Sequence, residues 1–304
     1  MRAAVLRETG APLSVEDVAE PDVAEGQSVV EVRAAGINFA DVLIRDGRYP
    51  QPPELPTVLG NEVAGELGGR RVVAFARLTG GGYAERVAVE DEWVFDLPAN
   101  ASFAEGAAFL TTYLTAWIPL MRQARIHRDS NVLVTAAAGG VGTAAIQLAT
   151  FAGASVTAAA GSEEKLALAR ELGARRTVSY EEIGELDDID VALDPVGGPV
   201  YAACLRSLRP LGTAIAIGFA GGAWEPVDPA RLVGRNTAAT GFYLGRLMGM
   251  RPDLVREEVR ELLAVWGRGS LRPVVGAEFP LEQANDALDL IASRGSTGKV
   301  VLVP

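Results

Sequence analysis

The chain has 304 residues, enough for two domains, and 49% of them are hydrophobic, which predicts an ordered core. The 28 Lys and Arg against 39 Asp and Glu give a net charge of −11, which repels nucleic-acid phosphates and anionic membranes. One cysteine and one histidine exclude an internal disulfide and are too few for a zinc site. We therefore expect a cytoplasmic protein with no metal, no nucleic-acid partner and no membrane partner.

The first hundred residues predict a compact β-rich domain. The apolar stretch at residues 1–6 is too short for a signal peptide and is interpreted as a strand. Further short apolar runs, such as residues 71–75 and 83–89, alternate with glycine and proline. Four prolines between residues 50 and 56 predict a loop there.

From about residue 105 the pattern changes to apolar segments that alternate with helical ones. A buried helix is expected over residues 107–120, and His127 follows in a polar segment that we place at the surface. Strands are expected at 131–136, 155–160, 176–179, 191–194, 213–218 and 237–241, with helices at 143–152 and 162–172. Strands that are apolar on both faces and alternate with helices predict a parallel, doubly wound Rossmann sheet.

The tail, residues 274–304, predicts a strand, an amphipathic helix and a final strand that complete the first domain. The predicted boundaries are 1–105 and 242–304 for the first domain and 106–241 for an inserted nucleotide-binding domain.

A glycine motif follows the first strand of the predicted Rossmann domain. It matches G-x-G-x-x-G if Ala137 replaces the first glycine, with Gly139 second and Gly142 third. The second glycine lets the backbone approach a pyrophosphate, the third lets helix and strand pack closely, and the helix N-terminus offers free N–H groups. A ligand-free turn is the alternative, but the spacing of strand, helix and next strand favours a dinucleotide. The expected contacts are Ala138, Gly139, Gly140, Val141 and Gly142.

The tip of the second strand indicates which dinucleotide binds. An acidic residue there would bind the ribose 2′-hydroxyl of NAD, but the strand ends in alanines followed by Gly161 and Ser162. Ser162, Lys165 and Tyr180 are placed to contact a 2′-phosphate. The two glutamates after Ser162 fit the first turn of a helix that Ser162 caps. This pattern favours NADPH over NADH.

Several motifs together resemble the medium-chain dehydrogenase/reductase superfamily, in its zinc-free quinone oxidoreductase (zeta-crystallin-like) branch, over nearly the whole chain. The motifs are Asn38-Phe39-Ala40-Asp41, Arg45-Asp46-Gly47-Arg48-Tyr49-Pro50, Leu59-Gly60-Asn61-Glu62-Val63-Ala64-Gly65, Ala137-Ala138-Gly139-Gly140-Val141-Gly142, Asp194-Pro195-Val196-Gly197-Gly198 and Gly298-Lys299-Val300-Val301-Leu302. The resemblance implies a GroES-like β-rich catalytic domain joined to a Rossmann domain, and a homodimer. Zinc-dependent relatives carry a cysteine near Asn38 and a histidine at Asn61. The family usually has a longer stretch after Gly65, whereas this chain has only residues 66–70 there. The shortening changes the predicted surface of the catalytic domain, so the resemblance does not fix the substrate.

The resemblance also suggests roles for single residues. Gly161, Ser162, Lys165 and Tyr180 match positions that hold the 2′-phosphate of NADPH. Asn38 and Thr115 match residues near the nicotinamide, and Gly218 with Phe219 matches a segment beside its carboxamide. Structural roles remain open: a turn for Asn38, a helix carbonyl for Thr115 and the core for Phe219.

Without a metal, the protein has to act by placing a cofactor that supplies hydride. A quinone suits such a site, because its reduced form is stable as an anion or takes a proton from solvent. Related 2-enoyl thioester reductases use a tyrosine at the position of Tyr49 to protonate an alkene, so an enone or enoyl thioester reductase is the alternative, and a non-catalytic NADPH-binding protein is a third. Pocket walls are expected from Tyr49, Phe242 and Tyr243.

Overall fold

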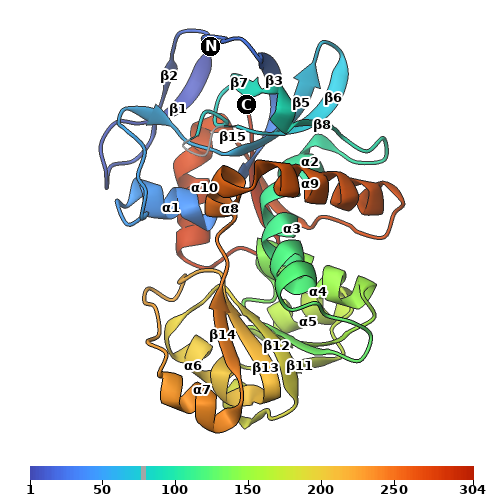
Figure 1. Ribbon diagram of the computed structural model, residues 1–304. Helices are drawn as coiled ribbons and strands as arrows, with labels where there is room; N and C mark the ends of the chain where they lie inside the picture. The colour runs from blue at the N-terminus through green and yellow to red at the C-terminus, as the bar shows by residue number, and fades with distance from the viewer. Residues whose placement is uncertain (77–79) are drawn as a thin grey trace. The chain divides into compact units, whose positions relative to one another are not determined.

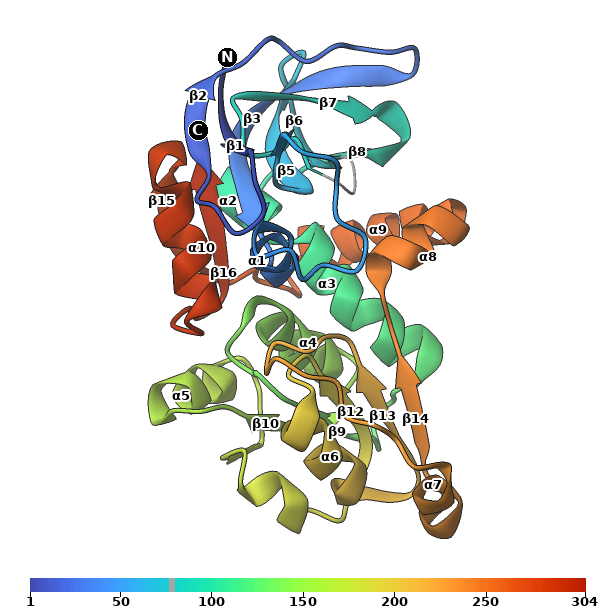
Figure 2. The same ribbon diagram turned by 90° about the vertical axis from the view of Figure 1, so that its left-hand side faces the viewer.

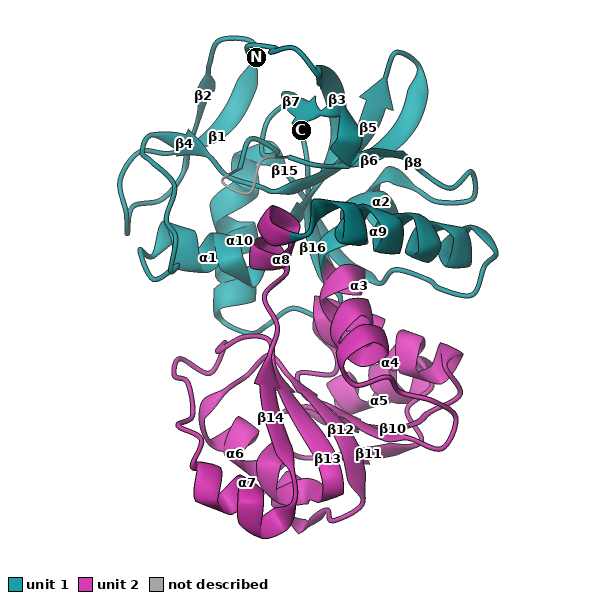
Figure 3. Cartoon of the chain, in the orientation of Figure 1, with its two compact units in different colours: residues 1–111, 251–304 teal, residues 112–250 magenta. Residues whose placement is uncertain are grey.

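The computed structural model describes residues 1–76 and 80–304, which divide into two compact units (Figures 1 and 3). Unit 1 contains Met1–Thr111 and Arg251–Pro304, and unit 2 contains Thr112–Met250. Among the described residues, no helix has the length and apolar character needed to cross a bilayer.

Unit 1 is built on two β-sheets. The larger sheet has the strand order β15-β16-β3-β5-β6-β8, with β7 also paired to β3, and the smaller has the order β2-β1-β4. The strands are β1 (Arg2–Leu6), β2 (Ser14–Asp17), β3 (Gln27–Ile37), β4 (Thr57–Val58), β5 (Glu62–Leu67), β6 (Arg70–Phe75), β7 (Arg86–Glu90), β8 (Val94–Asp96), β15 (Val275–Pro280) and β16 (Lys299–Val303). The helices are α1 (Phe39–Arg45), α2 (Phe103–Ala107), α9 (Pro252–Gly267) and α10 (Ala284–Ala292).

The end of the chain is part of unit 1. Strand β16 pairs antiparallel with β3, and α10 lies beside α1 (Figures 1 and 2). The Arg45 guanidinium lies 2.7 Å from Asp289 Oδ1, and the Leu13 amide donates to Asn285 Oδ1 at 2.8 Å. These contacts join the N-terminal and C-terminal segments into one core.

The short segment after Gly65 forms a tight hairpin between β5 and β6. Leu67 pairs with Arg70, and the turn between them consists of Gly68 at φ 57° and Gly69 at φ 82°. Two consecutive positive φ angles match the twist of a two-residue hairpin, and glycine adopts them without steric cost. A two-residue turn closes the hairpin within the short segment of chain available here.

Unit 2 contains a six-stranded parallel sheet of order β11-β10-β9-β12-β13-β14, the Rossmann order. The strands are β9 (Asn131–Val134), β10 (Ser155–Ala159), β11 (Arg176–Val178), β12 (Ile189–Asp194), β13 (Leu208–Ala216) and β14 (Ala238–Gly241). The helices are α3 (Leu110–Trp117, of which the first two residues belong to unit 1), α4 (Gly140–Phe151), α5 (Glu163–Glu171), α6 (Gly198–Ser207), α7 (Pro229–Arg235) and α8 (Leu244–Met250). Helices α4 and α5 pack on β9, β10 and β11, whereas α6 packs on β12 and β13 (Figure 1). The predicted doubly wound sheet is confirmed.

The helix expected over residues 107–120 is interrupted. Helix α2 ends at Ala107, α3 begins at Leu110, and a wider-turned helix, Ile118–Gln123, follows. Pro119 has no N–H and its ring crowds the preceding turn, so the chain widens there and the Ala124 amide donates to the Pro119 carbonyl, five residues back.

Candidate active site

Three strand and helix ends meet inside unit 1 and bring polar side chains together. Asn38 is the N-cap of α1, Glu62 opens β5 and Lys299 opens β16. Strand β3 lies between β5 and β16, and Gly36 on β3 leaves room for the cluster. A Cβ on Gly36 would lie 2.1 Å from the Ala107 carbonyl oxygen and 2.8 Å from Glu62 Cγ. A larger residue at Gly36 would displace Glu62 from this position.

Lys299 and Glu62 form a buried ion pair. Their side chains are 4% and 1% exposed, and Lys299 Nζ lies 2.5 Å from Glu62 Oε1. The Lys299 ammonium also donates to Asn38 Oδ1 at 2.5 Å, and Glu62 Oε2 accepts from the Thr111 amide at 2.9 Å. Both charges are therefore compensated by direct partners, as a buried ion pair requires.

The amide of Asn38 is oriented by this pair. Because an ammonium group only donates, the atom that faces Lys299 has to be Asn38 Oδ1. Asn38 Nδ2 then donates to Glu62 Oε1 and to Asn61 Oδ1, both at 3.0 Å. The two N–H bonds of Asn38 are thus committed within the cluster.

Asp41 and Tyr83 form the inner side of the same cluster. Asp41 Oδ2 accepts from the Asn38 amide at 2.7 Å and from the Tyr83 hydroxyl at 2.8 Å. Burial raises the pKa of Asp41 to about 6, although both hydrogen bonds and the Lys299 charge act to lower it. Burial, together with the neighbouring Asp41 charge, raises the pKa of Tyr83 well above its usual value.

The raised pKa of Asp41 predicts an unusual pH dependence of stability. Because this pKa is about 6 in the folded protein against an ordinary 3.8, protonation favours folding. The stabilising contribution is complete below about pH 4 and is lost as the pH rises through 6. Relative to Asp41→Asn, the wild-type free energy of unfolding should fall by on the order of 3 kcal/mol between pH 4 and pH 8, as urea unfolding of both proteins would measure. A difference that stays constant over this range would contradict the assignment.

The glycine motif in unit 2 forms a phosphate-binding type of loop between β9 and α4. Gly139 is the N-cap of α4. Because glycine has no side chain to cap the helix, the amides of the first turn have no side-chain partner. A Cβ on Gly142 would lie 2.3 Å from the Ala136 carbonyl oxygen and 2.8 Å from Ala137 Cα, so only glycine fits there. The helix begins at Gly140, three residues before the expected start, because the glycines themselves form its first turn.

A second loop beside β12 is fixed by Asp194, whose carboxylate is fully buried. Asp194 accepts from the Thr135 hydroxyl and from the Gly197 amide, the latter at 2.7 Å. Burial raises the pKa of Asp194. The Ala220 amide donates to the Pro195 carbonyl at 3.0 Å, which holds the segment with Gly218 and Phe219 against this loop.

The residues predicted for the 2′-phosphate lie together at the end of β10. A Cβ on Gly161 would lie 3.7 Å from the Tyr180 ring, and Ser162 caps α5, where its hydroxyl oxygen accepts from the Lys165 amide at 3.4 Å. The Glu163 carboxylate is paired with Arg170 at 2.6 Å, which compensates the nearest negative charge.

The remaining predicted residues are divided between the units. Tyr49 is partly buried against the core of unit 1, and its amide donates to the Leu43 carbonyl at 3.1 Å. Thr115 lies half-buried on α3 of unit 2, and Phe242 with Tyr243 follows β14 there. The expected surface position of His127 is confirmed, because its side chain is 68% exposed.

Sequence reasoning missed the roles of Asp41, Glu62, Tyr83 and Lys299. One signal was available: Lys299 is the only charged residue of a final strand that is otherwise apolar, Lys299–Val303. A lysine that opens a buried strand needs an anionic partner.

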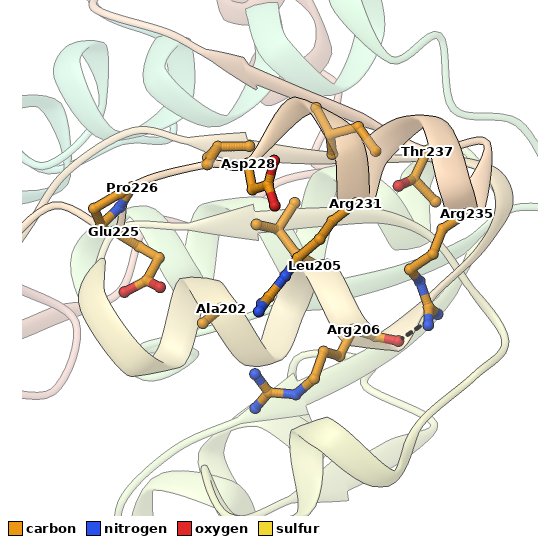
Figure 4. A pocket seen from close by; sticks show the side chains of 11 residues that line it. Ala202, Leu205, Arg206, Glu225, Pro226, Asp228, Arg231, Arg235 and Thr237 are labelled. Carbon is orange, nitrogen blue, oxygen red and sulfur yellow. Dashed lines mark hydrogen bonds between the residues drawn. The ribbon is translucent and has the colours of Figure 1, made fainter.

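Unit 2 also has a surface pocket of about 270 Å³ between α6 and α7 (Figure 4). Arg206, Arg231 and Arg235 line it together with Glu225 and Asp228, and Arg235 Nη2 donates to the Arg206 carbonyl at 2.8 Å. None of the predicted cofactor or substrate residues lines this pocket, so it is separate from the candidate site.

The fold and the phosphate-binding type of loop define a nicotinamide-dinucleotide oxidoreductase, and comparison with known proteins agrees. Residues 24–99 match the family Alcohol dehydrogenase GroES-like domain, and residues 140–265 match Zinc-binding dehydrogenase. The chain is 36% identical to quinone oxidoreductase-like protein 2 of Rattus norvegicus, over 99% of this chain and 91% of the relative. It is 32% identical to the synaptic vesicle membrane protein VAT-1 homolog of Homo sapiens, over 94% and 81%.

Among solved structures, the quinone oxidoreductase of Thermus thermophilus, which was also determined in complex with NADPH, superposes with a TM-score of 0.91. It is 40% identical, and the match covers 100% of both chains. The chain belongs to the quinone oxidoreductase family of the medium-chain dehydrogenases/reductases.

The residues of the cluster do not fit the zinc that the matched family's description implies. Zinc sites use cysteine, histidine and carboxylate ligands, and within residues 1–76 and 80–304 no three such side chains gather. The amides of Asn38 and Asn61 are poor zinc ligands, and the Lys299 ammonium already takes the oxygens of Asn38 and Glu62. A metal ion placed here would be repelled by a buried positive charge.

Proposed function

We propose that the protein is an NADPH-dependent, zinc-independent reductase that transfers hydride to quinones or similar electron-poor carbonyl compounds, and that it works as a cytoplasmic homodimer. The observation that carries this proposal is that the chain has two features of such an enzyme. Unit 2 has a glycine loop suited to a dinucleotide, and unit 1 has a polar cluster whose central charge is the Lys299 ammonium rather than a metal ion. The relative of known structure from Thermus thermophilus binds NADPH, which supports the cofactor.

The residues of unit 2 fit such a cofactor. The amides of Gly139, Gly140, Val141 and Gly142, with Ala138, would hold the pyrophosphate at the start of α4. Gly161, Ser162, Lys165 and Tyr180 would hold the 2′-phosphate. Thr115, Gly218 and Phe219 would lie beside the nicotinamide. NADPH supplies the hydride when it is bound.

Lys165→Ala should weaken NADPH binding selectively. A lost charged hydrogen bond to the 2′-phosphate corresponds to about a tenfold to hundredfold rise in Kd. NADH lacks this phosphate, so its Kd serves as the internal control and should not change. Fluorescence titration of the wild type and of Lys165→Ala with each cofactor measures these Kd values. An equal rise in the Kd for NADH would place Lys165 outside the 2′-phosphate site.

The chain itself contributes placement and hydrogen bonds rather than a strong acid. Hydride addition to a quinone leaves a hydroquinone anion, which takes its proton from solvent: quinone, NADPH and a proton give hydroquinone and NADP⁺. In unit 1 the Tyr83 hydroxyl donates a hydrogen bond to the Asp41 carboxyl, and both groups are buried, which shields them from a substrate. The proposed reaction therefore needs no protein group that changes its protonation state.

An activated-alkene reductase is the second candidate, because Tyr49 stands where related 2-enoyl thioester reductases carry the tyrosine that protonates an alkene. Tyr49 lies in a loop that backbone hydrogen bonds to Leu43 hold in place, with its side chain packed on the core. If its hydroxyl protonates carbon in an enone or enoyl thioester, Tyr49→Phe should lower kcat by about 10²–10⁴ on those substrates.

For a quinone reductase we expect Tyr49→Phe to lower kcat by less than about tenfold, because the ring still packs and only the hydroxyl is lost. Steady-state kinetics of both proteins on quinones, enones and enoyl thioesters measures the effect. A hundredfold loss on an alkene, with NADPH affinity unchanged, would reverse the order of the two candidates.

A non-catalytic NADPH-binding protein is the third candidate, from another functional class. NADPH binding without turnover of any quinone, enone or enoyl thioester would support this third candidate.

A further inference from the structure

We propose that Asn61 is the hydrogen-bond donor that polarises the substrate carbonyl, and that Lys299 and Asn38 are positioning residues that orient it. This inference rests on the proposed function, since it names the group that would contact a quinone at that site. It assigns a direct role to a residue outside the predicted catalytic pair of Tyr49 and Asn38.

The orientation of Asn61 follows from a chain of donors that starts at Lys299. The ammonium fixes Asn38 Oδ1, so Asn38 Nδ2 has to face Asn61, at 3.0 Å. Only an acceptor can take that bond, which makes the near atom of Asn61 its oxygen. The Nδ2 of Asn61 consequently points away from the cluster.

The Asn61 amino group is a donor that the described part of the chain leaves unused. Asn61 has no hydrogen bond within residues 1–76 and 80–304 other than the one its oxygen accepts, and the residue is partly exposed. Asn38 differs, because both its N–H bonds are taken by Glu62 and Asn61. Of the two amides, Asn61 alone has N–H bonds to offer a ligand.

The backbone holds this donor rigidly. Gly60 has φ 89°, and a Cβ there would lie 2.3 Å from the Tyr83 ring. The chain therefore turns tightly over Tyr83 and enters β5 directly after Asn61. A donor that is fixed before the reaction stabilises developing charge without the cost of reorganisation.

The chemistry of the acceptor fits an uncharged donor of this kind. As hydride reaches a quinone, electron density moves to a carbonyl oxygen, which becomes the oxyanion of the hydroquinone. An N–H bond of Asn61 would bind that oxygen more strongly as its charge grows. The proton that completes the hydroquinone comes from solvent, so Asn61 only donates hydrogen bonds.

The test compares Asn61→Leu, which has a similar size and no donor, with Asn61→Asp, which keeps an acceptor for Asn38 and removes both N–H bonds. We expect kcat for quinone reduction to fall about a hundredfold in each, with the NADPH Kd unchanged. Asn100→Leu, the same substitution at an exposed asparagine of unit 1, is the matched control and should keep wild-type kcat. Wild-type kcat in Asn61→Leu would overturn the proposal.

Two further readouts separate the positioning roles from general structural damage. Asn38→Leu should lower kcat less than Asn61→Leu, and the double variant should lose no more than Asn61→Leu alone, because both act through one donor. Additive losses would contradict the orienting chain. The infrared carbonyl band of a quinone added to the NADP⁺-loaded protein should lie at lower frequency in wild type than in Asn61→Leu.

The infrared measurement requires no turnover. If wild type reduces no quinone, the proposed function fails, while the band position still decides whether Asn61 binds the carbonyl. An identical band in wild type and Asn61→Leu would overturn this inference even if the enzyme reduces quinones.

Discussion

Lys299→Met should lower the free energy of unfolding by about 3–5 kcal/mol, the largest effect on stability that we expect from a single substitution in this protein. The Glu62 carboxylate is 1% exposed and would lose the ammonium that lies 2.5 Å from it. The Thr111 and Asn38 donors remain, but neither carries a charge to balance the carboxylate. Urea unfolding at neutral pH measures the loss.

Two control variants isolate the cause. In Lys299→Met/Glu62→Gln no buried charge is left alone, so most of the stability should return. Arg7→Met removes an ion pair of the same length, 2.5 Å, in which Arg7 is 61% exposed, and it should hardly change the unfolding midpoint. If Lys299→Met unfolds at the same urea concentration as Arg7→Met, the Lys299–Glu62 ion pair does not stabilise the folded protein.

Gly142→Ala should raise the Kd for NADPH by about a hundredfold or more. The added Cβ would lie 2.3 Å from the Ala136 carbonyl oxygen, so the loop between β9 and α4 has to shift. A shift that removes one or two charge-assisted amide bonds to a phosphate corresponds to about 3 kcal/mol, or a hundredfold in Kd. NADH should lose as much, because it has the same pyrophosphate.

The control for this variant is Gly249→Ala on α8, where an added Cβ would meet no atom within 4 Å. It should bind NADPH as wild type does. Both variants should keep the far-ultraviolet circular dichroism of the wild type, since neither change removes a helix or strand. Unaltered NADPH affinity in Gly142→Ala would mean that the loop does not hold the pyrophosphate.

The two units were not equally visible in the sequence. The Rossmann unit could be predicted because its central strands, such as β9 and β12, are apolar on both faces and the glycines before α4 give a local signal. Helix α9 was missed, although Val255, Val259 and Leu262 recur at helical spacing. Trp266 on this helix stacks on Phe109 at 4.3 Å in the core of unit 1. Such packing joins positions more than 150 residues apart, and local periodicity carries no information about it.

The residues of the candidate site also differ in how far the sequence could indicate them. Motif spacing indicated the loop residues of unit 2, because they are consecutive in sequence. The cluster of unit 1 depends on pairing between β3 and β16, which brings Lys299 to Asn38 across most of the chain. Only the three-dimensional arrangement shows that Asn38 is committed within the cluster and that Asn61 keeps a donor.

The most direct test of the proposed function is anaerobic NADPH oxidation by the purified, tag-free protein with a panel of quinones, enones and enoyl thioesters, before and after treatment with a metal chelator. We predict hydroquinone formation matched to NADPH consumed, a much slower reaction with NADH at equal concentration, and no effect of the chelator. Turnover of an enone or enoyl thioester without reduction of any quinone would contradict the account, as would activity that disappears with the chelator and returns with zinc.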